Sequence, residues 1–382
     1  MNSFDLIYEK ITPKKVKLKQ HKPVIISVPD INFTGDSLKF ILERLKYLKN
    51  FKAIQLHVIF DLGKTNFSDK ITFLLLDIIF YDLFKTTRWM LDLKINVELC
   101  LGAFNSGIKT TAFYRTLEKP GAEFDRNTFI KEFEKFVTTE DTYRRYVTRE
   151  KFEQKSTILS AISTDISTVL SQIYDDENWI NEVCNVIDEL IDNTYSHTES
   201  DCLIDINVCN VSDCESKNYK LLNIAVLNFS EDRIFDRIKN NIKEEKYSHT
   251  DEVYQNVYKA YQNHQQFFNE IYNEDDFFNV TVFQNGVTTR NLCSGTSGTG
   301  LTELIRNIVG KTKDSYSYVL SGENILFFRN KYLEIKDKHF VGFNEEADYI
   351  SCRPDISVIK RSRVYIPGTI FHLSLLRENY DG

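Results

Sequence analysis

Residues 178–198 read NWINEVCNVIDELIDNTYSHT, and this stretch decides how the second half of the chain is interpreted. Apolar side chains recur in it every three or four residues, which predicts a helix over 178–195 with one face against a core. The opposite face carries polar side chains, among them Glu189 and Asn193. These two residues are one helical turn apart, so we expect their side chains to be neighbours in space.

The Glu189/Asn193 pair has the chemistry that a nucleotide-hydrolysing site requires. An asparagine oxygen can ligate Mg²⁺, and a carboxylate can orient or deprotonate a water molecule. The same pair is common on solvated helix faces, so its spacing alone leaves the function open.

The segment Glu189-Leu-Ile-Asp-Asn193-Thr-Tyr-Ser-His197-Thr198 resembles the N box of the GHKL ATPase superfamily, which includes gyrase, Hsp90, histidine kinases and MutL. The resemblance implies that Asn193 is the Mg²⁺ ligand and that Glu189 is the catalytic base. It also implies ATP and Mg²⁺ as cofactors.

A glycine-rich loop, Gly295-Thr-Ser-Gly298-Thr299-Gly300-Leu301, precedes a helical pattern over 302–309. Glycines allow close backbone approach, and a helix N-terminus offers unpaired amides to phosphate. The loop resembles the G2 box of the same superfamily, which implies nucleotide contacts by Gly298, Thr299, Gly300 and Leu301. The preceding residues 285–290 resemble a lid segment, so Arg290 is expected near the terminal phosphates.

Two strand-like segments resemble the parts of the superfamily that recognise adenine. Asn228 follows the strand pattern 221–227 and takes the place of the G1-box aspartate, which accepts a hydrogen bond from the adenine amino group. Ser230 and Asp232 replace the two glycines of that box. An asparagine oxygen can still accept from an amino group. Near the end of the chain, Gly368-Thr369 resembles the GT strand, whose threonine contacts adenine.

The first half of the chain predicts a smaller α/β domain. Strand-like and helix-like patterns alternate over 23–29, 35–50, 53–62, 69–85 and 93–101. This alternation favours parallel strand pairing. The start of the second helix resembles that of the STAS domain in anti-sigma-factor antagonists, where a serine can be phosphorylated. We interpret Ser68 as the N-cap of that helix, because serine is a preferred capping residue.

The fold is therefore predicted to be α/β in two parts. An α/β domain is expected over 1–125, a helical connector over 126–175, and a Bergerat-type ATP-binding domain over 150–382, with helices on a mixed, largely antiparallel sheet. A long lid insertion is expected at about 234–290. Its apolar spacing from Val253 to Tyr261 predicts a helical portion.

The composition excludes several classes of protein. A net charge of −7 gives no general attraction to nucleic acid, and seven cysteines without a CxxC pair are interpreted as reduced thiols. The N-terminus lacks the apolar core of a secretion signal, and the most apolar run, 71–84, is too short to span a bilayer. We therefore expect a cytoplasmic protein without membrane contact.

The predicted function is an ATP-binding conformational switch that hydrolyses ATP with Mg²⁺. Two alternatives stay open: a serine/threonine kinase of the anti-sigma-factor type, and a non-catalytic partner-binding module with a degenerate nucleotide site. Residues 58–196 contain no histidine, which disfavours autophosphorylation of a histidine on a preceding helix. The expected partner is another protein or a second copy of the chain.

Overall fold

The computed structural model of the chain describes residues 3–67, 69–96, 107–117, 124–154, 157–197, 200–212, 218–248, 250–287, 300–314, 316–336 and 340–378. The chain divides into two compact units. The first comprises Met1–Tyr146, Ile204–Cys209 and Arg363–Tyr365, and the second comprises Val147–Leu203, Asn210–Ser362 and Ile366–Gly382. The fold is α/β, with a three-stranded parallel sheet and a six-stranded antiparallel sheet.

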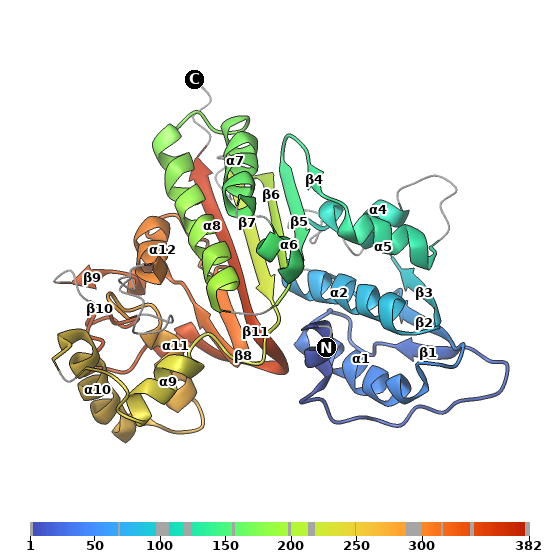
Figure 1. Cartoon of the computed structure of the whole chain (residues 1–382), viewed down its shortest axis with the longest axis horizontal. Helices are drawn as coiled ribbons and strands as arrows, with labels where there is room; N and C mark the ends of the chain where they lie inside the picture. Colours follow the sequence, from blue (N-terminus) through green and yellow to red (C-terminus); the bar gives the residue numbers. More distant parts are fainter. Residues whose placement is uncertain are drawn as a thin grey trace. The chain divides into compact units, whose positions relative to one another are not determined.

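The first unit begins with strands and helices in alternation (Figure 1). In chain order they are β1 (Val24–Ser27), α1 (Gly35–Leu48), β2 (His57–Leu62), α2 (Lys70–Thr86) and β3 (Met90–Ile95). Strand β2 lies between β1 and β3 and pairs with both in parallel. The predicted parallel pairing is confirmed, because each helix returns the chain for another strand in the same direction.

The N-terminus of α2 differs from the prediction in its capping residue. Asp69 is the N-cap, and its carboxylate accepts hydrogen bonds from the backbone N–H groups of Ile71 and Thr72 at 3.3 and 3.2 Å. Aspartate and serine are similarly preferred at the N-cap, so capping preference alone could not decide between Ser68 and Asp69. Ser68 itself lies outside the described residues.

Helix α2 contains the most apolar run of the chain. Every residue from Lys70 to Phe84 is buried. A helix that is apolar on all sides is typical of a protein core. Within the residue ranges given above, no helix is both long and apolar enough to cross a membrane.

Strand β5 corrects the expected helical connector over 126–175. The elements that follow β3 are η4 (Ile108–Thr110), α4 (Ala112–Leu117), α5 (Arg126–Glu134), β4 (Val137–Thr138) and β5 (Thr142–Val147). Two short 3₁₀ helices, η1 (Ser3–Tyr8) and η2 (Lys49–Phe51), occur before β3. The residues of β5, TYRRYV, are largely β-branched or aromatic, which favours a strand. Its two arginines do not share a solvated face, since Arg144 is fully buried and Arg145 is half-buried.

The second unit is built on long strands. The six-stranded sheet has the order β4-β5-β6-β7-β11-β8, in which β6 is Cys202–Ser212, β7 is Asn218–Asn228, β11 is Ile359–Glu378 and β8 is Tyr318–Phe327. Strands β7 and β8 and most of β11 belong to the second unit, whereas β4, nearly all of β5 and the middle of β6 are assigned to the first. Strand β11 pairs antiparallel with β7 on one side and with β8 on the other. The largely antiparallel sheet predicted for this half is confirmed by these pairings.

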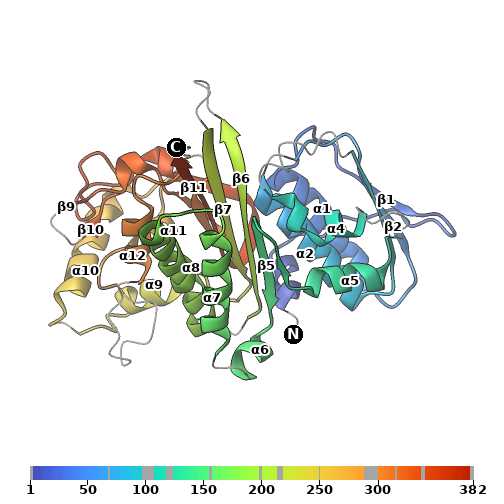
Figure 2. The ribbon, with the colours of Figure 1, turned by 90° about the horizontal axis from the view of Figure 1, so that it is seen from above.

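Two helices, α7 (Ile158–Ser171) and α8 (Glu177–His197), pack against each other on one face of this sheet (Figure 2). Helix α6 (Arg149–Gln154) precedes them, and α12 (Gly300–Ile308) also packs on α8. Val183, Ile187 and Leu190 are buried, which confirms the apolar face predicted for the 178–195 helix.

Helices lie along the described part of the chain between β7 and α12. It forms α9 (Asp236–Lys243), α10 (Glu252–His264), η5 (Gln265–Phe267) and α11 (Glu274–Thr281). Helix α10 contains the helical portion predicted from Val253 to Tyr261. Between β8 and β11 lie η7 (Asn330–Tyr332), β9 (Ile335–Lys336), β10 (Phe340–Val341) and η8 (Ile356–Val358).

Candidate functional site

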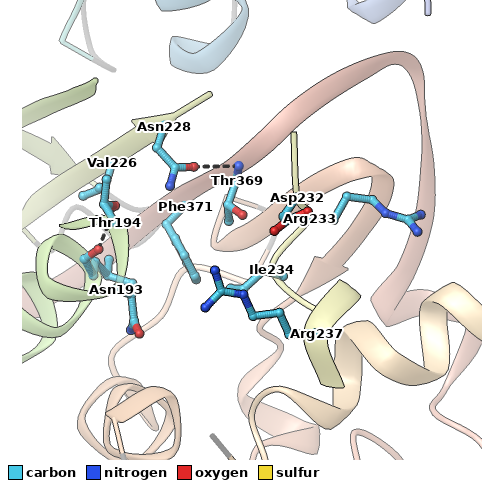
Figure 3. A pocket seen from close by; sticks show the side chains of 11 residues that line it. Asn193, Thr194, Val226, Asn228, Asp232, Arg233, Ile234, Arg237, Thr369 and Phe371 are labelled. Carbon is cyan, nitrogen blue, oxygen red and sulfur yellow. Dashed lines mark hydrogen bonds between the residues drawn. The ribbon is translucent and has the colours of Figure 1, made fainter. Parts of the chain in front are cut away.

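A pocket in the second unit collects residues from α8, β7, β11 and the segment that enters α9 (Figure 3). The lining residues are Leu190, Asn193, Thr194, Val226, Asn228, Asp232, Arg233, Ile234, Arg237, Thr369 and Phe371. Three of them, Asn193, Asn228 and Thr369, were predicted from three separate sequence motifs. The fold brings these three residues together.

Helix α8 supplies the carboxylate–amide pair. Asn193 Nδ2 donates a hydrogen bond to Glu189 Oε1 at 2.9 Å, as expected for side chains one turn apart. Because the amide nitrogen faces Glu189, the amide oxygen of Asn193 faces away from that carboxylate. On the buried side of the same turn, the Thr194 hydroxyl donates to the Leu190 carbonyl at 3.0 Å.

The far side of the pocket is formed where β7 and β11 pair. Thr369 lies opposite Asn228 in the strand register, and its backbone N–H donates to Asn228 Oδ1 at 2.7 Å. This contact joins residues 141 positions apart in the sequence. The predicted base-recognition residues are therefore adjacent in space, but the amide oxygen of Asn228 already accepts one hydrogen bond.

Gly368 makes this close approach of the two strands possible. Its φ is +79°, in the left-handed region that favours glycine. A Cβ atom at this position would lie 2.6 Å from the Asn228 carbonyl oxygen and 2.7 Å from the Ser230 nitrogen. Both are backbone atoms, so neither can rotate away. The Gly-Thr pair in the sequence thus reflects a steric requirement of the pocket wall.

Replacing Gly368 with alanine is expected to destabilise the protein by about 2–4 kcal/mol, through left-handed strain and overpacking against β7. Gly310→Ala is the matched control, because Gly310 has a φ of +76° and a Cβ added there would meet no atom within 4 Å. Gly310→Ala should lower the free energy of unfolding by about 1 kcal/mol, because only the strain of a left-handed backbone is added there. Urea unfolding of both variants measures the difference, and equal costs would contradict the steric role of Gly368.

Ser321, on β8, connects the two sides of the pocket wall, and sequence reasoning missed it. Its hydroxyl donates to the Gly368 carbonyl at 2.7 Å and accepts from the Ile234 backbone N–H at 3.0 Å. The side chain is fully buried. No sequence signal singles it out, because the strand YVLSGENILF contains several polar residues. Its burial shows that the hydroxyl needs partners, which Gly368 and Ile234 supply.

Two arginines also line the pocket, Arg233 just before α9 and Arg237 within α9. Arg233 donates from Nη2 to Asp236 at 2.7 Å and from Nη1 to Asp275 at 2.5 Å. Burial alone would lower the pKa of the Arg233 guanidinium, but the two carboxylates raise it above its ordinary value. Arg237 directs its guanidinium into the pocket (Figure 3). The predicted phosphate-binding cation, Arg290, lies outside the described residues.

An ionic cluster, formed by Arg233, Lys239, Glu274 and Asp275, holds the segment entering α9 and α9 itself against α11. Lys239 Nζ lies 2.6 Å from Glu274 and 2.8 Å from Asp275, which also receives Arg233. Burial would raise the pKa of the Asp275 carboxyl, but Lys239 and Arg233 hold it below its usual value. The cluster therefore positions the helix that carries Arg237.

The glycine-rich loop is described only at its end. Arg290, Gly298 and Thr299 lie outside the described residues. Gly300 begins α12, and the Leu301 side chain is buried without being among the described residues that line the pocket. The expected phosphate contacts of this loop therefore remain predictions.

The donor set around Asn193 suits Mg²⁺ better than a transition metal. Among the described residues no group of three or more His, Cys, Asp or Glu side chains is placed to hold a metal ion. Mg²⁺ does not need such a group, because it keeps several waters and is commonly held by one or two protein oxygens plus substrate phosphates. The Asn193 amide oxygen, directed away from Glu189, fits that role.

Comparisons of the chain with protein-family models, curated proteins and solved structures gave no match.

Proposed function

We propose that the second unit binds a purine nucleoside triphosphate together with Mg²⁺ and hydrolyses it as a conformational switch. The GHKL resemblance implies ATP as the nucleotide. One observation carries the proposal: Asn193, Asn228 and Thr369, selected from separate motifs, line a single pocket. The switch would report its nucleotide state to a protein partner or to a second copy of the chain.

The pocket has an apolar part for a base and a polar part for phosphates. Leu190, Val226, Ile234 and Phe371 supply apolar surface suited to the faces of a purine ring. The Arg237 guanidinium supplies the positive charge that phosphate oxygens require. This division supports a nucleotide as the ligand more than a wholly apolar or wholly anionic small molecule.

Asn193 is the residue that would hold Mg²⁺, through its amide oxygen. When bound, the ion would neutralise the charge that develops on the phosphate oxygens. Glu189 lies beside Asn193 and would orient the attacking water and accept its proton. Binding of the ion and activation of the water would thus fall to two neighbouring side chains of one helix.

Removing the Asn193 side chain tests this assignment. Asn193→Ala should weaken nucleotide binding about 10- to 100-fold with Mg²⁺ present, because a charge-assisted contact is lost. With EDTA present, the variant and the wild type should bind about equally weakly. Titration calorimetry of the full chain with a non-hydrolysable ATP or GTP analogue measures both values.

Asn185→Ala is the matched control, since Asn185 is exposed on the same helix and does not line the pocket. It should bind as the wild type does. An Asn193→Ala protein with unchanged Mg²⁺-dependent affinity would overturn the assignment. Absence of nucleotide binding in the wild type would instead favour the non-catalytic partner-binding module. Phosphate transferred to protein, rather than released, would favour the kinase.

A further inference from the structure

We infer that the exposed face of the three-stranded parallel sheet is a contact surface for a second copy of the chain. Helices α1 and α2 lie on the same side of β1 and β2 (Figure 2). Parallel sheets occur almost only with both faces covered. The face of this sheet that points away from α1 and α2 is therefore expected to have a partner. The sheet lies in the first unit, so the inference does not depend on nucleotide binding in the second.

The side chains of β2 show which residues form this face. His57, Ile59 and Asp61 alternate with buried residues and are themselves half-buried, so they point away from the helices. In the strand register, Ile25 of β1 lies beside Ile59, and Met90 of β3 lies beside His57. Ile25 is 56% exposed and Met90 is 51% exposed. The open face, as we name it, comprises these five residues together with Asp92 and Lys94 of β3.

The centre of the open face is apolar. Ile25 and Ile59 are direct neighbours on adjacent strands, and Met90 lies one row away. Single exposed apolar side chains are common on monomers, but these three adjoin one another. Their burial is favourable by about 25 cal/mol per Å². An apolar centre with a polar border is the usual composition of a protein–protein contact.

Charges of both signs border this centre. His57 Nε2 lies 2.6 Å from Asp92 Oδ2, and Lys94 Nζ lies 4.0 Å from Asp61 Oδ2. Two carboxylates and two basic side chains leave little net charge, so the open face does not favour nucleic acid or an anionic membrane. A surface that carries both signs in a fixed order is matched best by a surface that carries them in the reverse order.

A second copy of the open face supplies the reverse order after a twofold rotation. His57 and Asp61 lie two residues before and after Ile59, each about 7 Å from it along β2. Two copies can pack face to face with their β2 strands antiparallel and Ile59 on the twofold axis. In that arrangement His57 of each copy faces Asp61 of the other. The contact is isologous, so it closes as a dimer.

The hydrogen-bonding capacity of His57 suits this arrangement. An imidazolium ring donates from both nitrogens, so His57 can bind Asp92 of its own chain and Asp61 of the other copy together. The two copies of Asp92 would also face each other, and each is compensated by its own His57 at 2.6 Å. The two copies of Ile59 would meet between the His57–Asp61 pairs.

The size of the sheet limits the strength of the contact. Its strands contain four to six residues. From the ordinary strand spacing and rise per residue, the open face measures roughly 15 by 20 Å, or about 300 Å² in outline. Stable interfaces bury about 800 Å² per partner. We therefore expect a weak, reversible dimer with a dissociation constant of about 0.1 mM.

Sedimentation velocity of the full chain without nucleotide, from about 1 µM to about 1 mM, tests the inference. The wild type should pass from monomer to dimer within this range. Ile59→Glu should weaken the association about tenfold or more, because two carboxylates would meet on the axis. Ile356→Glu is the matched control, since Ile356 is 56% exposed and lies in the second unit. It should associate as the wild type does.

Cross-linking tests the position of the axis independently. With Ile59→Cys, a short bismaleimide should link two copies, because residue 59 of each copy faces that of the other. Ile356→Cys should give no more covalent dimer than the native cysteines of the wild type give. A wild type that stays monomeric up to about 1 mM would overturn the inference. A dimer that a folded Ile59→Glu protein still forms would also overturn it, and if that variant unfolds, the cross-linking result decides.

Discussion

Replacing Glu189 with glutamine is expected to lower the rate of nucleotide hydrolysis about 10²- to 10⁴-fold, the usual contribution of a general base. Nucleotide affinity should stay near the wild-type value. The glutamine oxygen can still accept from Asn193 Nδ2, so the 2.9 Å contact and the helix face are preserved. What is lost is the ability to take a proton from water. Phosphate release at saturating nucleotide measures the rate, and titration measures the affinity.

Glu182→Gln is the matched control for this variant. Glu182 lies on the same helix, bonds to Lys311 at 2.6 Å and does not line the pocket. The same change of charge at this site should leave hydrolysis unchanged. A Glu189→Gln protein that hydrolyses nucleotide at the wild-type rate would show that another group activates the water.

Replacing Arg144 with methionine is expected to destabilise the first unit by about 3–5 kcal/mol, because two buried carboxylates lose their cationic partner. The Arg144 guanidinium is fully buried and bonds to Asp77 at 2.6 Å and to Asp205 at 3.0 Å. Lys70, also buried, lies 2.7 Å from the other oxygen of Asp205. Asp77 in turn accepts the backbone N–H groups of Ala112 and Phe113 at 3.1 Å. The network therefore also holds the start of α4.

The cost of Arg144→Met should depend on pH. Burial would raise the pKa of Asp205, but Lys70 and Arg144 lower it, so its contribution to stability exists above about pH 4 and is lost below. Burial already raises the pKa of Asp77 in spite of Arg144. Without the guanidinium both carboxyls titrate higher in the folded state. A carboxyl with a raised pKa in the folded state lowers the free energy of unfolding as pH rises, because its charged form is disfavoured there. The loss of stability caused by Arg144→Met should therefore be smaller at pH 4 than at pH 7.

The chain's two tryptophans allow this measurement to be made on one unit. Trp89 is buried in the first unit and Trp179 lies in the second. In a Trp179→Phe background, urea unfolding followed by fluorescence reports the first unit alone. Arg145→Met is the control, since Arg145 is half-buried and lies over the Phe136 ring. Equal costs for the two arginines, or a cost independent of pH, would contradict the network's role.

Local patterns predicted the parts of the structure that local interactions determine. The spacing of Val183, Ile187 and Leu190 identified α8 and placed Glu189 beside Asn193, because a helix repeats every 3.6 residues. The contact between Asn228 and Thr369 depends on a strand register that no local pattern encodes. The sequence selected the two residues separately, because the segment around each resembles a motif of the GHKL superfamily, and their contact with each other was not predicted.

What was missed depends on tertiary context. Arg144 in β5 looked like part of a charged helix, because its burial is made possible by Asp77 and Asp205, which are distant in sequence. Ser321 and Arg237 carry no motif, and their place at the pocket follows from how β8 and α9 pack. Such residues are found from coordinates, since composition and periodicity do not distinguish them from ordinary strand or helix positions.

The attachment of α9 to α11 depends on the ionic strength of the solution. Only two of its eight residues, Ile238 and Ile242, are buried. The ionic cluster supplies the rest of the attachment, and its side chains are about a fifth to a quarter exposed. Dissolved ions weaken charge pairs of this kind, with a screening length of about 8 Å at physiological ionic strength. Higher salt should therefore hold α9 less rigidly, and with it the Arg237 side chain, even without a bound nucleotide.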